Sequence, residues 1–421
     1  MSDPEPTTSI ALVADTDSRW KWAKATATKL GPTTQQHLLI EGPARPNERQ
    51  LREAGVEPSQ VTTTTIAGLA DAVSPDTEVV IVALPGGACQ AVLHALAARW
   101  GTQRPVIITG YVGVVYEKIV EGLLLRAGSD IIVANSPHDA RLFRGYFVDY
   151  GLDPDAVVES PLPYLGPPVA STRPHPFTVT FAAQPSVPAT ARERSYVVDR
   201  LVRHARLHPE REVILKLRNL PGERVTHPDA YPYPQLLDRV GDVPANLSMV
   251  GGPMTQVLAR TDLLLTVSST AAVEAVQAGI ATGILTDFGI NDQLGTTFYA
   301  GSGCLTSFDQ VDDGAAPHAD QDWAVDNGLH SLDHAQLRTR VMSLVAAGAL
   351  PAIQPFYQQR TAGYYLPRLL AAYGLGPDGR ALAPSATRRS PLRRVARAIA
   401  HRLYRFGDSV VAPKLRRLGA L

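Results

Sequence analysis

The chain has 421 residues, 45% of them hydrophobic, and its 40 Lys and Arg balance 40 Asp and Glu. This length exceeds one ordinary hydrophobic core and predicts two to three domains. No apolar run approaches the roughly 20 residues of a membrane span, and the polar N-terminus is unlike a secretory signal, so we expect a cytoplasmic protein. Cys89 and Cys304 lie far apart and indicate neither a metal cluster nor a disulfide framework.

The first half of the chain repeats an apolar strand, a polar or glycine-containing turn and a helix. We expect strands at 9–14, 36–40, 79–83, 105–109 and 131–134, and helices at 19–30, 88–100 and 117–126. This alternation predicts a parallel sheet with helices on both faces. Residues 160–176 contain six prolines and are typical of an interdomain linker.

The same alternation resumes after the linker. We expect strands at 177–182, 212–217, 246–250 and 280–288, and helices at 189–207 and 254–259. The predicted fold class is therefore α/β, with domains at 1–165 and 177–375, a linker at 166–176 and a tail at 376–421. The helical sequence at 334–373 can end in the second domain or cross back to cover the first.

Residues 263–279 join an apolar strand to a hydroxyl-rich turn and a helix. Ser268, Ser269 and Thr270 form the turn, where free helix amides and hydroxyls suit an anion. Parallel sheets bind ligands at the carboxyl ends of their strands, which favours this position. The same hydroxyls can instead simply cap the helix. Glu274, further along the helix, can accept the hydroxyls of a ribose or form a surface salt bridge.

Two cations end the strand at 212–217. Lys216 and Arg218 point to the same face, because side chains alternate along a strand. At a carboxyl end they can neutralise phosphates beside the hydroxyl turn, or they can be solvated charges of a strand end. The His227-Pro228 pair follows them along the chain.

The first strand ends in two carboxylates, which are the candidates for acid/base chemistry. Asp15 or Asp17 can take a proton from an attacking hydroxyl if partial burial raises its pKa. Alternatively, Asp17 or Ser18 caps the following helix and has no chemical role. Trp20 and Trp22 come next and predict an aromatic rim beside the turn.

Two further turns carry weaker signals. The glycine turn at 110–114 lacks the third glycine of a dinucleotide fingerprint. The segment 135–139 is typical of a helix cap, and His138 within it can also serve as a second acid/base or a phosphate contact. We see no metal-ligand constellation and no Walker loop, so we expect neither a metal site nor a cofactor.

The tail is strongly basic. Residues 386–421 hold ten Lys and Arg against one acid, Asp408, and their apolar residues recur at helical spacing. The pattern predicts an amphipathic helix at 388–417 that binds an anionic membrane surface. The alternatives are a helix docked on the acidic body of the protein and a flexible tail. Nucleic acid is not expected as a partner, because the body of the protein is acidic and would repel a nucleic-acid backbone.

The residues from Thr266 to Ala275 resemble the serine-rich donor-phosphate turn of bacterial sialyltransferases and of CDP-glycerol glycerophosphotransferases. Lys216, and more loosely His227-Pro228, are similar to the Lys and His-Pro positions of those families. Over residues 8–375 the chain resembles glycosyltransferases of the GT-B architecture, above all actinobacterial proteins described only by that activity. The resemblance implies two Rossmann-like domains facing each other across a cleft, with a nucleotide-sugar held by the C-terminal one.

The resemblance also implies a reaction. A metal-independent glycosyltransferase would move a sugar from a nucleotide-sugar, with CMP- and CDP-activated donors among the candidates, to a hydroxyl of a glycan or lipid-linked acceptor in surface polysaccharide or glycolipid synthesis. Asp15 or Asp17 would act as base, and the hydroxyl turn with Lys216 and Arg218 would stabilise the leaving phosphate. The tail would place the enzyme at the inner face of the membrane. The alternatives are a nucleotide-sugar epimerase of the same fold and a non-catalytic nucleotide-binding scaffold.

Overall fold

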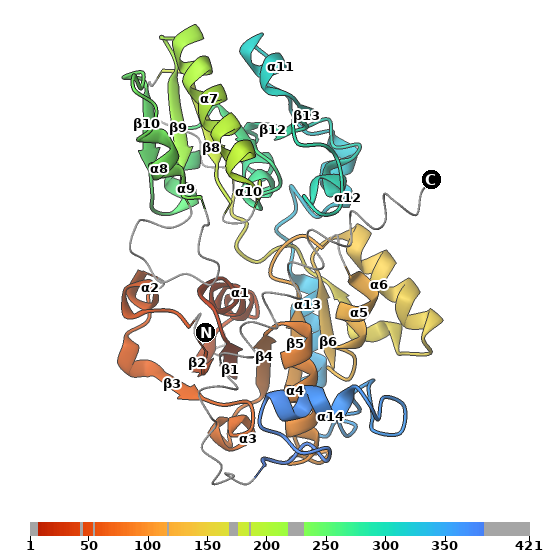
Figure 1. Cartoon of the computed structure of the whole chain (residues 1–421). Helices are drawn as coiled ribbons and strands as arrows, with labels where there is room; N and C mark the ends of the chain where they lie inside the picture. The colour runs from red at the N-terminus through yellow and green to blue at the C-terminus, as the bar shows by residue number, and fades with distance from the viewer. Residues whose placement is uncertain are drawn as a thin grey trace, which may run out of the picture. The chain divides into compact units, whose positions relative to one another are not determined.

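The computed structural model describes residues 7–42, 45–53, 55–115, 118–167, 176–184, 187–217 and 231–382. It contains two parallel sheets within one compact unit, Met1–Arg380, which confirms the predicted α/β class (Figure 1). Arg218, His227 and the basic segment 388–417 lie outside the described residues. Among the helices in the described ranges, none has the length and hydropathy that a membrane span requires.

The first sheet has seven strands in the order β3-β2-β1-β4-β5-β6-β7, all paired in parallel. The strands are β1 (Thr8–Ala14), β2 (Thr33–Ile40), β3 (Val61–Thr64), β4 (Val79–Ala83), β5 (Val106–Gly110), β6 (Ile131–Ala134) and β7 (Val157–Glu159). The connecting helices are α1 (Asp17–Thr28), α2 (Glu48–Glu53), η1 (Pro58–Gln60), α3 (Leu69–Ala72), α4 (Gly86–Ala97), α5 (Ile119–Leu124), α6 (Pro137–Asp149) and η2 (Pro154–Ala156).

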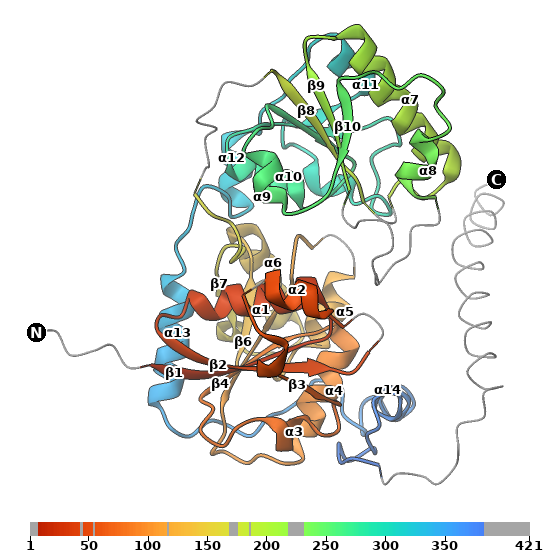
Figure 2. The ribbon, with the colours of Figure 1, turned by 90° about the vertical axis from the view of Figure 1, so that its left-hand side faces the viewer.

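Alternating residues of β1 serve two separate cores on the two faces of this sheet. Ile10 and Leu12 pack with α1, whereas Ala11 and Val13 pack with α3 and α4 on the opposite face (Figure 2). Trp20 and Trp22 of α1 are fully buried in the first of these cores. The prediction of an aromatic rim beside the turn was therefore wrong, because both indoles fill the space between helix and sheet.

The second sheet has six parallel strands in the order β10-β9-β8-β11-β12-β13. The strands are β8 (Thr178–Ala182), β9 (Glu212–Lys216), β10 (Leu247–Val250), β11 (Leu263–Thr266), β12 (Ala281–Leu285) and β13 (Leu305–Thr306). The helices are α7 (Ala191–Leu207), α8 (Tyr233–Leu237), α9 (Met254–Leu258), α10 (Ala271–Gln277), η3 (Thr296–Tyr299), α11 (Phe308–Asp312) and α12 (Gln321–Asp326).

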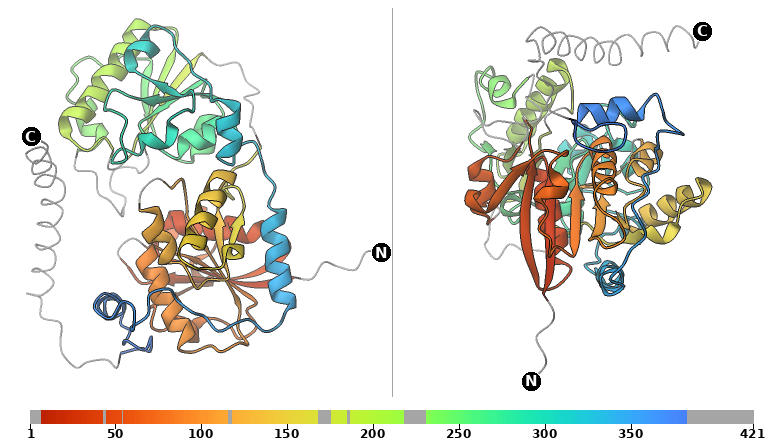
Figure 3. Two further views of the ribbon diagram at one scale, coloured as in Figure 1. Left: turned by 90° about the vertical axis from the view of Figure 1, so that its right-hand side faces the viewer. Right: turned by 90° about the horizontal axis from the view of Figure 1, so that it is seen from below.

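The last two described helices return to the first sheet. Leu337 and Val341 of α13 (Ala335–Ala346) join the core under α1, and Leu366 and Leu370 of α14 (Leu366–Ala372) join the core under α4. Figure 3 shows both helices beside the first sheet. Of the two possibilities for residues 334–373, the structure shows the crossing back, which differs from a second domain running from 177 to 375.

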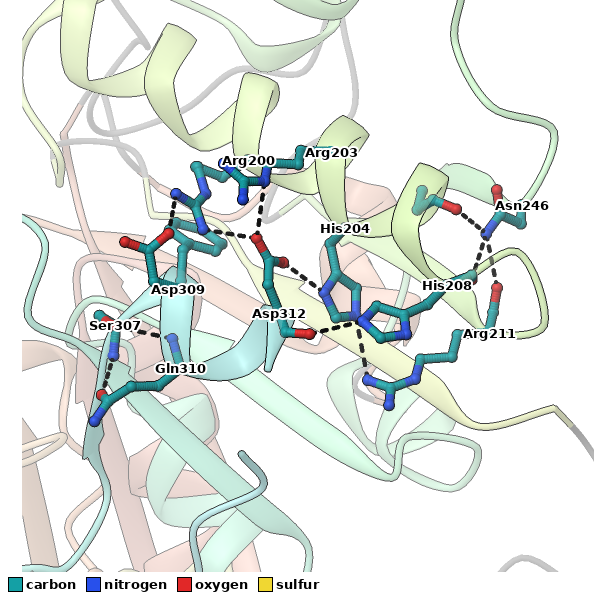
Figure 4. A network of polar contacts seen from close by, with 12 residues as sticks. Arg200, Arg203, His204, His208, Arg211, Asn246, Ser307, Asp309, Gln310 and Asp312 are labelled. Atoms are coloured by element: carbon teal, nitrogen blue, oxygen red, sulfur yellow. Dashed lines mark hydrogen bonds and ion pairs between the residues drawn. The ribbon is translucent and has the colours of Figure 1, made fainter. Parts of the chain in front are cut away.

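A buried network of charges holds α11 against α7 (Figure 4). The Asp312 carboxylate accepts from Arg200 at 2.7 Å and from His204 Nδ1 at 2.9 Å, and its carbonyl lies 2.9 Å from His208 Nε2. Arg200 also pairs with Asp309 at 2.6 Å. Since α11 follows β13 directly, this network fixes the edge of the second sheet.

Candidate functional site

In each sheet the early strands are added toward one edge and the later strands toward the other edge. The position between the two strands where this direction reverses is the topological switch point. Open α/β sheets bind ligands there, outside the carboxyl ends of the two strands concerned. In the first sheet the point lies between β1 and β4, and in the second between β8 and β11. Asp15 and Asp17 follow β1, and the predicted hydroxyl turn follows β11. The topology thus gives both predicted sites the position that favours ligand binding.

The hydroxyl turn is held by Gln184, which lies just beyond β8. The backbone N–H of Ser268 donates to Gln184 Oε1 at 2.9 Å, and Gln184 Nε2 donates to Ser268 Oγ at 3.2 Å. Because β8 and β11 flank the switch point, the Gln184 side chain connects the segments that follow these two strands. Sequence reasoning missed Gln184, because a single polar residue after a strand carries no signal of its own.

The three hydroxyls of the turn have different environments. Ser268 is buried, Ser269 Oγ accepts from the Ala271 N–H at 3.2 Å, and Thr270 is exposed and makes no side-chain cap bond to α10. Tyr299 supports the turn by donating to the Ser269 carbonyl at 3.2 Å. Simple helix capping therefore explains only Ser269, and the backbone around it is fixed independently of any ligand.

Lys216 and Glu274 form a second feature of the same edge. Lys216 ends β9 and is 4% exposed, so it is not a solvated strand-end charge, and its Nζ donates to the Leu217 carbonyl at 2.5 Å. Burial raises the pKa of Glu274 to about 7, against the opposing pull of Lys216, and burial lowers the pKa of Lys216. The two charges interact in a poorly solvated place, which does not fit a surface salt bridge for Glu274.

The first sheet presents Asp15 and Asp17 at its switch point. Arg19 donates to Asp15 Oδ1 at 2.9 Å, and Lys21 donates to Asp17 Oδ2 at 2.8 Å. Thr16 caps α1 by accepting from the Arg19 N–H, so the alternative interpretation, in which Asp17 or Ser18 provides the cap, was wrong. Asp15 has Arg19 as its ion-pair partner and is partly buried at the end of β1, the strand that pairs with β4.

Two more turns reach this region from β5 and β6. Asn135 donates to the carbonyls of Tyr111 and Gly113 at 2.9 and 3.1 Å, which ties the two turns together. A Cβ on Gly113 would lie 3.1 Å from Thr270 Cγ2, so the glycine turn reaches the hydroxyl turn. Asp139 is buried, and burial raises its pKa to about 6. Sequence reasoning did not single out this carboxyl.

His138 has a different environment from the other candidates. Its exposed ring places Nδ1 3.5 Å from Asp326 Oδ2 of α12, and Arg141 binds the same carboxylate at 2.6 Å. The structure thus brings Ser268, Ser269, Lys216 and Glu274 to one sheet edge, and it places the His138 ring beside the Asp326 carboxylate. In the described ranges no group of three or more His, Cys, Asp or Glu is suited to hold a metal ion.

Two parallel sheets, each with polar side chains at its switch point, define the GT-B class of two Rossmann-like domains. The family model described as "Putative glycosyltransferase (DUF6716)" matches residues 10–344. The chain belongs to this family, and glycosyl transfer is its class of reaction. A search of curated proteins found no significant match.

Solved structures share the fold at low sequence identity. The UDP-GlcNAc 2-epimerase of Neisseria meningitidis bound to UDP-GlcNAc gives a TM-score of 0.50 at 8% identity, covering 81% of this chain and 99% of that chain. The Methanocaldococcus jannaschii UDP-GlcNAc 2-epimerase in complex with UDP-GlcNAc and UDP gives 0.50 at 9% identity, covering 80% and 99%. The pneumococcal O-GlcNAc transferase GtfA in complex with UDP and GlcNAc gives 0.47 at 10% identity, covering 82% and 96%. At such identities these similarities show the fold alone, and they do not favour the epimerase alternative.

Proposed function

We propose that the second domain binds the nucleotide-sugar donor at the switch point between β8 and β11. The observation that carries this proposal is the hydroxyl turn, because Gln184 holds Ser268 in place from the opposite side of that point. Ser269 and Thr270 contact the donor phosphates, and Lys216 supplies positive charge at the same edge. Glu274 accepts hydrogen bonds from the ribose hydroxyls.

The acceptor hydroxyl binds at the first sheet in this proposal. Asp15 is the preferred base, because it directly follows β1 beside β4, whereas Asp17 already belongs to α1; both carboxylates are partly buried and each pairs with one cation. The carboxylate takes the proton as the acceptor oxygen attacks the sugar carbon, and the phosphate leaves toward the hydroxyl turn. His138 remains a second candidate for acid/base chemistry or a phosphate contact.

Three further features complete the proposal. The donor is the co-substrate, and the reaction uses neither a metal nor another cofactor, since the cations that neutralise the phosphates are side chains. Residues 388–417, with Arg218 and His227 outside the described ranges as well, are assigned from sequence alone. The basic segment binds an anionic membrane, which places the enzyme beside a glycan or lipid-linked acceptor in polysaccharide synthesis.

A thermal-shift panel of CMP, CDP, UDP, GDP and ADP tests donor binding. UDP belongs in the panel because both epimerases of similar fold were solved with uridine nucleotides. A nucleotide at 100 times its Kd should stabilise the protein by about 2.7 kcal/mol. Ser269→Ala should reduce this stabilisation, because it removes a hydroxyl that donates a hydrogen bond to the nucleotide phosphate.

Ser307→Ala is the matched control for that panel. Ser307 caps α11 in the same domain, so this variant should lose about 1 kcal/mol of stability and keep the nucleotide response. A folded protein that responds to no nucleotide would contradict the proposal and favour a scaffold. Donor turnover without any acceptor, yielding an isomeric sugar rather than free nucleotide, would favour the epimerase.

A further inference from the structure

The return of α14 to the first sheet brings a tyrosine to the switch point between β1 and β4. Leu366, Leu370 and Leu375 anchor this segment in the core that Ala11 and Val13 of β1 share with α4. Tyr373 follows α14 directly and packs against the same core while remaining partly exposed. The anchors fix its backbone, so the ring has a defined place rather than that of a loose surface residue.

The turn after β4 faces this tyrosine. A Cβ on Gly87 would lie 3.7 Å from the Tyr373 hydroxyl oxygen and 3.1 Å from Leu369 Cδ1. The hydroxyl therefore points to the start of α4, at the carboxyl end of β4, and not into the apolar core. Asp15 comes directly after β1, whose last residue, Ala14, pairs with Ala83 at the end of β4. The Tyr373 hydroxyl and Asp15 thus both lie beyond the carboxyl ends of two neighbouring strands, β4 and β1.

The charges around Tyr373 agree with this placement. Burial raises the pKa of the Tyr373 phenol, and the negative charge of Asp15 raises it further. Cys89 and Tyr365 act in the same direction, whereas Arg19 lowers the pKa. Asp15 and its partner Arg19 are therefore both within electrostatic range of the phenol, which stays protonated and able to donate a hydrogen bond.

We propose that Tyr373 is a positioning residue of the acceptor site, whose hydroxyl binds a hydroxyl of the incoming sugar and holds that acceptor beside Asp15. This inference rests on the proposed function and deepens it. The segment that crosses back from the second domain thereby completes the acceptor site of the first. A neutral phenol next to a carboxylate and an arginine fits a polyhydroxylated acceptor such as a glycan, because it can both donate and accept hydrogen bonds.

The first experiment tests whether Tyr373 and Asp15 lie close together, independently of any substrate. We would incorporate 3-fluorotyrosine at position 373 of the full chain and follow its fluorine resonance through a pH titration. Asp15→Asn should lower the phenol pKa, because it removes the negative charge that opposes the phenolate. Leu369→Ala, on the same helix and against the same glycine, should leave the pKa in place. A Tyr373 phenol pKa that is the same in Asp15→Asn and in the wild type would overturn the proposal.

The second experiment uses the donor that the nucleotide panel selects, with methyl glycosides of glucose, galactose and mannose as acceptor probes. Tyr373→Phe keeps the ring and removes one hydrogen bond, so the acceptor KM should rise about 10-fold while the donor KM is unchanged. Leu369→Ala should not raise the acceptor KM selectively. A change in donor KM alone, or no transfer difference between wild type and Tyr373→Phe, would reject the assignment.

These measurements separate this inference from the proposed function. If the phenol pKa responds to Asp15→Asn but no nucleotide stabilises the protein, Tyr373 and Asp15 are neighbours as inferred. The proposed donor site is then rejected, and the acceptor role of Tyr373 is rejected with it. A nucleotide response with an unresponsive Tyr373 would remove only the tyrosine.

Discussion

The second domain contains two groups of buried charges that differ in how completely they are bonded. Asp312 accepts from Arg200 and His204, and Arg211 lies 3.5 Å from the other ring nitrogen of His204. That arrangement needs a neutral His204, in agreement with the lowering of its pKa by burial. Lys216 and Glu274, by contrast, oppose each other's desolvation only in part, and the pKa of Glu274 rises to about 7.

The contrast separates a structural role from a functional one. A network in which each charge has hydrogen-bonded partners holds its elements together and has little left to offer a ligand. Charges that are desolvated with few partners destabilise the empty protein, and such groups concentrate at functional sites. The position agrees with the bonding, since the Asp312 network joins two helices at the sheet edge, whereas Lys216 ends a strand beside the switch point.

Removing the centre of the bonded network should have the largest effect. Asp312→Ala removes the buried carboxylate that accepts from Arg200 and His204, which leaves Arg200 with the exposed Asp309, and it should lower the free energy of unfolding by about 3–5 kcal/mol. Denaturant titration at pH 7.5 measures this loss. Asp309→Ala is the matched control, because that carboxylate is 73% exposed and pairs with the same arginine. It should cost about 0–1 kcal/mol, and equal losses in both variants would show that the network is not what holds α11.

Gln184→Ala tests whether the hydrogen bonds that hold the hydroxyl turn are needed for nucleotide binding. The variant leaves the buried Ser268 N–H and hydroxyl without their partner, so the turn should lose its fixed geometry. We expect nucleotide affinity, measured by calorimetry, to fall about 100-fold, or roughly 3 kcal/mol. Gln310→Ala removes a capping glutamine of α11 in the same domain and should leave the affinity unchanged. An undiminished affinity in Gln184→Ala would mean that the nucleotide binds elsewhere.

Much of this fold follows from local sequence, because buried parallel strands are apolar throughout. The strands at 79–83 and 131–134 were predicted with the bounds of β4 and β6. The edge strands β3 (Val61–Thr64), with three threonines, and β7 (Val157–Glu159), with three residues, were missed. β3 is largely solvent-accessible and β7 has only two buried residues, so neither strand has a hydrophobic pattern long enough to be recognised.

The candidate site divides in the same way. The turn at 268–270 was predictable, since a strand, a hydroxyl cluster and a helix are contiguous in the sequence. Gln184 was not, because it lies 84 positions before Ser268 and meets it only through sheet pairing. Tyr373 was not predictable either, because only the packing of α14 on the first sheet decides which domain it joins.

The pair of Lys216 and Glu274, unlike the Asp312 network, should make the free energy of unfolding depend on pH. Glu274 holds its proton in the folded state up to a pKa of about 7, whereas the unfolded chain releases it near the ordinary value of 4.5. The stability that this proton contributes is therefore complete below 4.5 and lost as the pH rises through 7. Glu274→Gln does not titrate, so it should equal the wild type near pH 4.5 and exceed it by about 3 kcal/mol at pH 8. Denaturant titrations at both pH values decide this, with the exposed Glu41→Gln as control; a pH-independent difference would show that Glu274 is solvated and paired like an ordinary surface carboxylate.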